Sequence, residues 1–347
     1  MQIVDDRWSV RELRNLRGFA IEWAEPGRII ASRRHQLYRL TTLGDTPRYA
    51  GSYPEAMWKR VASRSRLGQR LLRSMFFNIM PLADGRLFLT FAKSVGVLVG
   101  DTVEPLRGLA RPTRILRSGC AADGNGSVFF GEYLTNNERG PIRVYRLPSG
   151  SLELEVVHVF PAGDVRHVHG IFNDPQSGCL WCVTGDRGEE CRIMRTVDGF
   201  RTIEVVGAGD ETWRTVSLLF HARGLIYGSD AEFQQNYIYS LDPETGVRTR
   251  LAVTEGPVYY AYTNGIDHCL AVTAEGCASQ TEFVASIWRV SEDGKANRLL
   301  KVAKDRYPNQ FLVGTLHFPS GPGLPSRIPF HAVALEGDNR TFCLEMN

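Results

Sequence analysis

The densest group of chemically capable side chains is the run Arg166-His167-Val168-His169-Gly170. It lies in an apolar stretch typical of a β-strand, where His167 and His169 would point to the same face. Two imidazoles in that relation suit a divalent metal such as Ca, Mn or Zn, with His317 or Asp186 as a third ligand. They suit general acid–base catalysis equally well, because histidine titrates near neutral pH. Burial as ordinary core histidines is the alternative.

Tyrosines accompany the histidines in the same kind of position. Tyr259 and Tyr260 open another strand-like run, and Tyr133 follows Glu132. A tyrosine facing a histidine across a basic pocket could carry out β-elimination on a uronic acid. An arginine or a metal would neutralise the carboxylate, one side chain would remove the C5 proton, and the other would protonate the departing oxygen.

Basic, histidine or tyrosine residues open most of the strand-like runs along the chain. These residues are Arg17, Arg73, Arg117, His167, His169, Arg214, Tyr259, Tyr260 and His317. Four runs also end their second strand on an acid, namely Glu132, Asp186, Asp230 and Glu275. Antiparallel neighbours joined by a short turn bring the two sets together. The pairs either join structural units, since buried charges need partners, or form a pocket for an anionic ligand.

The elements that must position these residues form a repeat. A strand, a turn with glycine and a second apolar strand recur, as in LRSMFFNIMPLADGRLFLTF from Leu72 and WRTVSLLFHARGLIYGSD from Trp213. The period of roughly 40 to 57 residues is that of four-stranded propeller blades. We therefore predict one all-β domain over residues 1–347, a β-propeller of seven blades (six being possible). The two termini should share a blade, because closure removes open sheet edges. Two stacked sandwiches are the competing fold.

One segment interrupts the strand pattern. Residues 53–72 form a basic, helix-like insertion with Lys59, Arg60, Arg64, Arg66 and Arg70. Such a helix either packs on a propeller face or docks on a membrane or an acidic protein partner.

Composition limits the class of protein. A net charge of +3 gives no global argument for nucleic-acid binding. The start of the sequence has no signal-peptide pattern, no stretch has the length and apolarity of a transmembrane segment, and the seven cysteines are scattered and odd in number. These features predict a cytoplasmic protein with reduced thiols.

Two propeller groups resemble this chain. The stretch from Thr196 to Thr202, TVDGFRT, resembles an Asp-box of the sialidase and BNR-repeat superfamily, which implies an outer hairpin closed by Asp198. The repeat architecture and the His/Arg/Tyr channel are similar to those of propeller polysaccharide lyases. That similarity implies binding of an anionic, uronate-containing oligosaccharide, with lyase or glycosidase chemistry. A non-catalytic protein- or glycan-binding scaffold and a metal-dependent hydrolase are the alternatives.

The expected site residues follow from these two arguments. His167, His169, Tyr259 and Tyr260 are the predicted catalytic residues, and His167, His169 and His317 are the predicted metal ligands. The residues expected to bind the saccharide are Arg73, Arg117, Arg166, Arg214, Glu132, Asp186, Asp230 and Glu275.

Overall fold

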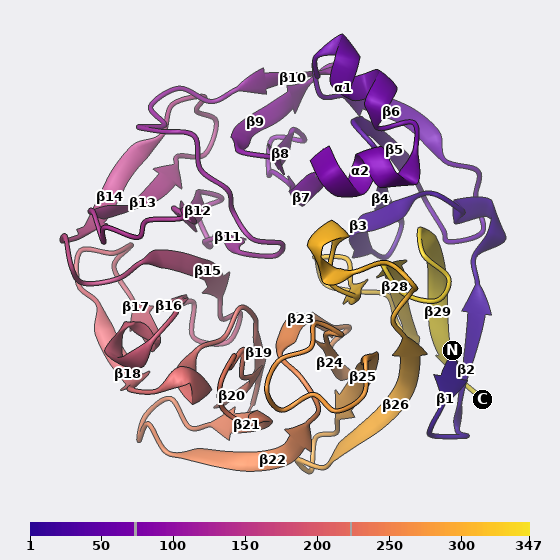
Figure 1. Ribbon diagram of the computed structural model, residues 1–347. Helices are drawn as coiled ribbons and strands as arrows, with labels where there is room; N and C mark the ends of the chain where they lie inside the picture. The colour runs from indigo at the N-terminus through magenta and orange to yellow at the C-terminus, as the bar shows by residue number, and fades with distance from the viewer. Residues whose placement is uncertain (73–74, 223) are drawn as a thin grey trace.

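The chain forms a ring of antiparallel sheets around a central axis (Figure 1). The computed structural model describes residues 1–72, 75–222 and 224–347. Arg73, one of the predicted saccharide-binding residues, lies outside the described residues. The ring is the β-propeller that the repeat predicts.

Six sheets are present among the described residues. The largest contains β3 (Ala20–Glu25), β4 (Arg28–Arg33), β5 (Gln36–Leu40), β6 (Arg48–Ser52), β7 (Phe76–Pro81), β8 (Leu87–Phe91), β9 (Ser94–Val99) and β10 (Thr102–Pro105). It consists of two consecutive four-stranded meanders, which the parallel pair Thr102–Ser52 joins at their outer strands. The predicted alternatives of seven and six blades correspond to counting these meanders separately or together.

The next three sheets are regular four-stranded meanders. They contain β11 (Cys120–Ala122), β12 (Val128–Gly131), β13 (Ile142–Leu147) and β14 (Glu155–Phe160), then β15 (His167–Asn173), β16 (Leu180–Gly185), β17 (Arg192–Thr196) and β18 (Glu204–Ala208), then β19 (Leu218–His221), β20 (Gly224–Gly228), β21 (Asn236–Leu241) and β22 (Arg248–Thr254). The first strand of each lies towards the ring centre and the last at the rim (Figure 1).

The final two sheets use both ends of the chain. One joins β1 (Gln2–Ile3) to β23 (Val258–Thr263), β24 (His268–Val272), β25 (Val284–Val290) and β26 (Ala296–Ala303), and the other joins β2 (Trp8–Glu12) to β27 (Thr315–His317), β28 (Arg327–Val333) and β29 (Arg340–Met346). The pairing of β2 with β29 confirms the predicted shared blade. Trp8 is buried in the core cluster of these two sheets, so the N-terminal strand also fills the interior.

Burial follows the position of each strand in its sheet. The second strands β8 and β16 are buried along their whole length, whereas the rim strand β22 is mostly exposed or only partly buried. Leu, Phe, Val and Ile fill the second strands because both faces of each sheet are covered by neighbouring sheets. This packing fixes the inner strands, and with them the side chains at their ends.

The insertion forms two short helices, α1 (Met57–Ala62) and α2 (Arg66–Leu72), on one face of the ring (Figure 1). The helix α1 buries none of its residues, whereas α2 buries Arg70 against the body of the protein. No helix among the described residues is long and apolar enough to cross a membrane. All seven cysteines are free thiols.

Candidate functional site

His167 and His169 point toward each other at the start of the inner strand β15. Their Nε2 atoms are 3.1 Å apart, and both side chains are almost fully buried. The ladder between β15 and β16 shifts register between Val168 and Gly170, so His169 is the extra residue of a β-bulge. A bulge re-aims the side chain it carries.

Asp186 completes a cluster of three converging atoms. Its Oδ1 lies 3.1 Å from His167 Nε2 and 3.3 Å from His169 Nε2. Its Oδ2 accepts a hydrogen bond from Arg166 Nη1 at 2.6 Å. Burial alone would raise the pKa of Asp186, but hydrogen bonds from the two histidines outweigh it and hold that pKa well below its usual range. Asp186 is therefore a carboxylate at neutral pH.

The opposite nitrogen of each imidazole faces a backbone carbonyl. His167 Nδ1 lies 2.8 Å from Leu134 O, and His169 Nδ1 lies 3.0 Å from Thr215 O. A carbonyl only accepts hydrogen bonds, so each Nδ1 carries a hydrogen. In that tautomer each Nε2 presents a lone pair, and an Nε2 that also carries a proton donates it to Asp186. The cluster therefore gathers two imidazole lone pairs and a carboxylate oxygen, which repel one another unless a proton or a cation lies between them.

These distances fit a metal ion. Nitrogen and oxygen ligands in four- or six-coordinate sites lie about 3.0 to 3.4 Å from one another. The three atoms meet that condition, and the two carbonyls supply the outer hydrogen bonds that metal-bound histidines usually make. Two imidazoles suit Mn or Zn better than Ca, which prefers oxygen. His169 also suits the neutral ligand form, because burial lowers its pKa to about 4.

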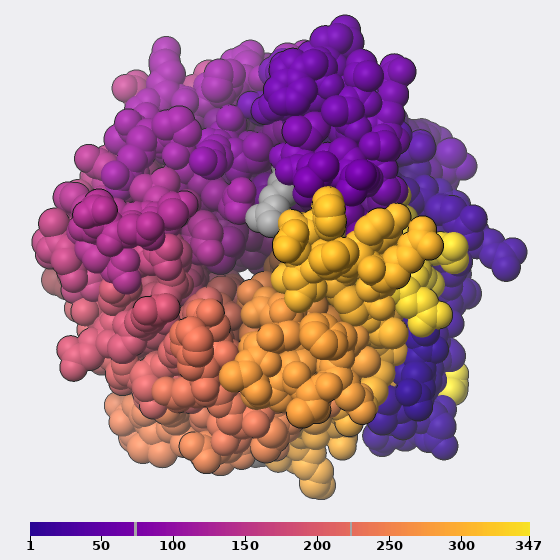
Figure 2. Space-filling model, in the orientation of Figure 1, coloured from indigo at the N-terminus to yellow at the C-terminus, as the bar shows by residue number. Residues whose placement is uncertain are grey.

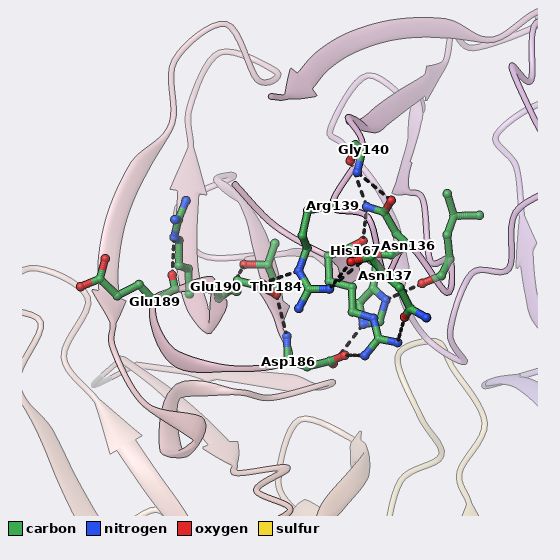
Figure 3. Close-up of polar contacts among 12 residues, drawn as sticks. Asn136, Asn137, Arg139, Gly140, His167, Thr184, Asp186, Glu189 and Glu190 are labelled. Carbon is green, nitrogen blue, oxygen red and sulfur yellow. Dashed lines mark hydrogen bonds and ion pairs between the residues drawn. The ribbon is translucent and has the colours of Figure 1, made fainter. Parts of the chain in front are cut away.

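A hydrogen-bond network holds the loops around this cluster (Figure 3). Arg139 Nε donates to Glu190 at 2.5 Å, and Glu190 accepts a 3.4 Å hydrogen bond from the backbone nitrogen of Asp186. Asn136 bridges Gly140 and the carbonyl of Arg166. The segment after β12 and the turn after β16 are thereby tied together, which fixes Asp186 relative to the histidines.

A polar pocket of about 370 Å³ opens above His167 and Asp186. Five of its lining residues are cationic side chains and two are carboxylates. They are Lys93, Arg114, Arg166, Arg187 and Arg214, then Asp186 and Glu232, with Tyr133, Leu134, Thr135 and His167 completing the lining. The excess of positive charge makes it a place for an anionic ligand.

Tyr133 forms one wall of this pocket. Its ring lies 4.1 Å from the His167 ring, centroid to centroid. Burial raises the pKa of Tyr133, and the charges of Asp186 and Asp230 raise it further. The phenol therefore holds its proton at neutral pH and can donate it.

A buried group extends the site toward β20 and β23. Arg214 lies 2.9 Å from Asp230 and 3.8 Å from Asp186, and the Tyr259 hydroxyl donates to Glu275 at 2.6 Å. Burial raises the pKa of Asp230 to about 7 against the opposing effect of Arg214, and it raises the pKa of Glu275 as well. Asp230 and Glu275 thus stand behind the pocket, and neither lines it.

The remaining predicted residues lie elsewhere. Arg117 forms an ion pair with Glu22 of β3, and the His317 ring packs on Tyr260, 4.8 Å between centroids. His317 Nε2 contacts the hydroxyl of Thr315 at 2.9 Å, and His317 is not part of the cluster of His167, His169 and Asp186. Arg117 and His317 line a separate pocket beside α2 and not the pocket over His167.

Glu132 is engaged by side chains of its own sheet and of the segment before it. It is fully buried and accepts hydrogen bonds from Arg111 and from the Tyr145 hydroxyl, the latter at 3.0 Å. Arg143 lies 3.7 Å away. None of these contacts faces the pocket over His167, so the geometry gives Glu132 a role in holding β12 and β13.

Four charged lining residues, Lys93, Arg114, Arg187 and Glu232, were absent from the sequence prediction. Arg187 and Glu232 follow the predicted acids Asp186 and Asp230 by one and two positions, so that proximity was the available signal. Lys93 lies on the β8–β9 turn and Arg114 precedes β11. No repeat pattern marks either residue.

Comparisons with known proteins identify the fold. No protein-family model matches the chain, and no curated protein matches it in sequence. Solved structures do match. An oligogalacturonate lyase in complex with manganese aligns at a TM-score of 0.62 and 11% identity over 97% of this chain and 93% of that one.

Two further structures resemble the chain in the same way. An oligogalacturonate lyase from Vibrio parahaemolyticus has a TM-score of 0.59 and 10% identity, covering 100% of this chain and 96% of that one. An ancestral GH74 enzyme has a TM-score of 0.54 and 10% identity, covering 96% of this chain and 45% of that one. At these identities the likeness establishes a propeller fold that carbohydrate-active enzymes also use.

Proposed function

We propose that this protein is a carbohydrate-active lyase that binds an anionic, uronate-containing oligosaccharide in the pocket over His167. The observation that carries the proposal is the convergence of His167 Nε2, His169 Nε2 and Asp186 Oδ1 within 3.3 Å of one another. These atoms would hold a divalent cation of the Mn or Zn kind. That cation would supply positive charge for a substrate carboxylate.

The charge around the cluster supports an acidic substrate. Lys93 and Arg187 line the pocket and make no ion pair with another described residue. They are therefore available for a ligand, whereas Arg166 and Arg214 are engaged by Asp186 and Asp230. Arginine binds carboxylates in bidentate geometry, which would orient a uronate ring.

Elimination needs one protein side chain that accepts the C5 proton of the substrate and another that donates a proton to the departing oxygen. Glu232 is the one acid besides Asp186 among the residues lining the pocket, and it forms no ion pair with a described cation. We assign it the removal of the C5 proton. The C4–O bond then breaks as the C4=C5 double bond forms, and Tyr133 gives its proton to the departing oxygen. The raised pKa of Tyr133 suits that donor role.

The test combines metal analysis with a product assay. Purified protein reconstituted with Mn²⁺ or Zn²⁺ is incubated with oligogalacturonates and glucuronate-containing oligosaccharides, and ultraviolet absorbance reports the unsaturated product. We expect about one metal per chain and rising absorbance. His169→Ala should lose both, whereas the control His158→Ala, on the rim strand β14, should keep both.

Each alternative function has its own signature in this experiment. New reducing ends without absorbance would indicate a metal-dependent hydrolase, which the open side of the three-ligand cluster would also permit. Saccharide binding without turnover would indicate a scaffold. A metal-free protein that releases no product and whose ligand affinity is unchanged by His169→Ala would refute the proposed site.

A further inference from the structure

A second pocket lies beneath the helical insertion and shares no lining residue with the pocket over His167. Its volume is about 190 Å³. Its walls come from the inner strand β3, the β4–β5 turn, α2 and β28, which are side by side on one face of the ring (Figure 1). In Figure 2 the atoms of the insertion pack directly against the C-terminal part of the chain on this face.

Six arginines line this second pocket. They are Arg33, Arg34, Arg64, Arg66, Arg70 and Arg117. Three of them have acidic partners: Arg66 binds Asp338 at 2.7 Å, Arg70 binds Asp305 and Asp338, and Arg117 binds Glu22. These pairs build the walls.

Arg33, Arg34 and Arg64 form no ion pair with another described residue. Arg34 Nη2 instead donates to the carbonyl of Arg64 at 3.4 Å, and the Arg33 guanidinium lies 5.3 Å from the Phe19 ring. The pKa of Arg34 is lowered by burial and then by the charges of Arg33 and Arg64. Three like charges therefore line the pocket without an ion-pair partner, while its one lining carboxylate, Glu22, is engaged by Arg117, so a bound anion would find free guanidinium groups there.

A further observation points to a ligand. Arg70 is 4% exposed, and its Nε and Nη1 have no hydrogen-bond partner among the described residues. Arg34 lies in the tight β4–β5 turn with a left-handed φ of 59°.

We infer that this pocket is a binding site for an oxyanion group, a phosphate, sulfate or carboxylate carried by a small ligand. The inference gives the insertion a role: α2 closes the pocket, and Arg64 at the α1–α2 junction contributes part of the charge. It does not depend on the reaction proposed for the pocket over His167, since the residues of the two pockets are distinct.

The probes are inorganic phosphate, sulfate and glucuronate, each titrated by calorimetry at constant ionic strength set with sodium chloride. We expect saturable binding of at least one probe, with a stoichiometry near one per chain. Preference for phosphate and sulfate would assign a tetrahedral oxyanion, and preference for glucuronate would assign a sugar carboxylate.

The test variant is Arg34→Asn with Arg64→Gln, because asparagine tolerates the left-handed turn. Losing two charge-assisted donors should weaken binding at least about tenfold. The control Arg39→Gln, on the exposed side of β5, should bind as the wild type does. If the double variant fails to fold, Arg33→Gln replaces it, with a smaller weakening expected. Equal affinities of wild type and variant, or no binding of any probe beyond chloride, would overturn the inference.

Discussion

Arg117 is one of the predicted substrate-binding residues, and its surroundings make a structural role for it sharply testable. Its guanidinium pairs with Glu22 of β3 and donates to the Phe76 carbonyl of β7 at 3.0 Å. Glu22 also accepts from the Ser32 hydroxyl of β4. The side chains of Arg117 and Glu22 are 6% and 2% exposed. One ion pair therefore ties the turn before β11 to three strands of the neighbouring sheet.

Truncating one partner should leave a buried charge uncompensated. Arg117→Ala leaves the buried Glu22 carboxylate without its ion-pair partner, which should lower the unfolding free energy by about 3 to 5 kcal/mol. Replacing both partners with apolar side chains removes the need for pairing. The double variant Glu22→Leu with Arg117→Met should therefore recover most of that loss and lie within about 1 kcal/mol of the wild type.

Equilibrium urea unfolding, followed by tryptophan fluorescence and circular dichroism, measures both variants. Arg39→Ala, at an exposed position of β5, is the control and should change stability by no more than about 0.5 kcal/mol. A single variant as stable as the control would refute the structural role. If that variant instead lost saccharide affinity, the substrate-binding role first expected for Arg117 would be restored.

Three further results are expected. Trp8→Ala should lower the unfolding free energy by about 3 to 5 kcal/mol in urea titrations, because it empties a core site where β2 closes the ring, whereas Trp58→Ala on the exposed side of α1 should change it little. Tyr133→Phe should lower kcat by a factor of about 100 or more while KM changes little, if its phenol protonates the leaving oxygen. A raised KM with an unchanged kcat would instead argue that Tyr133 only binds the substrate. Burial lowers the pKa of His331 from 6.5 to about 3, so the unfolded state takes up the proton first and stability falls as pH drops below 6.5. Between about pH 7 and pH 4.5, the unfolding free energy of His331→Gln should therefore fall by about 2 kcal/mol less than that of the wild type. Parallel pH profiles of the two unfolding free energies would contradict this.

Part of the site follows from local pattern alone. The alternation of a strand brings His167 and His169 to one face, and the turn residues place Asp186 at the end of the adjacent strand. These are short-range relations, since β15 and β16 are consecutive and antiparallel. The inward placement of both histidines and the nearness of Asp186 were therefore predictable, although the bulge at His169 was not.

Other partners depend on how neighbouring sheets and loops pack. The expected pairing of strand-opening basic residues with strand-ending acids holds for Arg214 with Asp230, but Arg117 pairs with Glu22, a residue 95 positions away in sequence. Glu132, expected near Arg117, instead binds Arg111. The sequence repeat predicts where basic and acidic residues occur, whereas the packing of loops and sheets determines which of them form ion pairs.

The sequence by itself determined the propeller, the ring closure by the N-terminal strand and the histidine pair, because strand period and repeat length are properties of the local chain. Only the tertiary structure decided that the cations divide between two pockets. Lys93 and Arg187 join the histidine cluster, and Arg34 and Arg64 gather under α2. Distances across a ring depend on sheet packing and on loops, whose conformations no periodicity encodes.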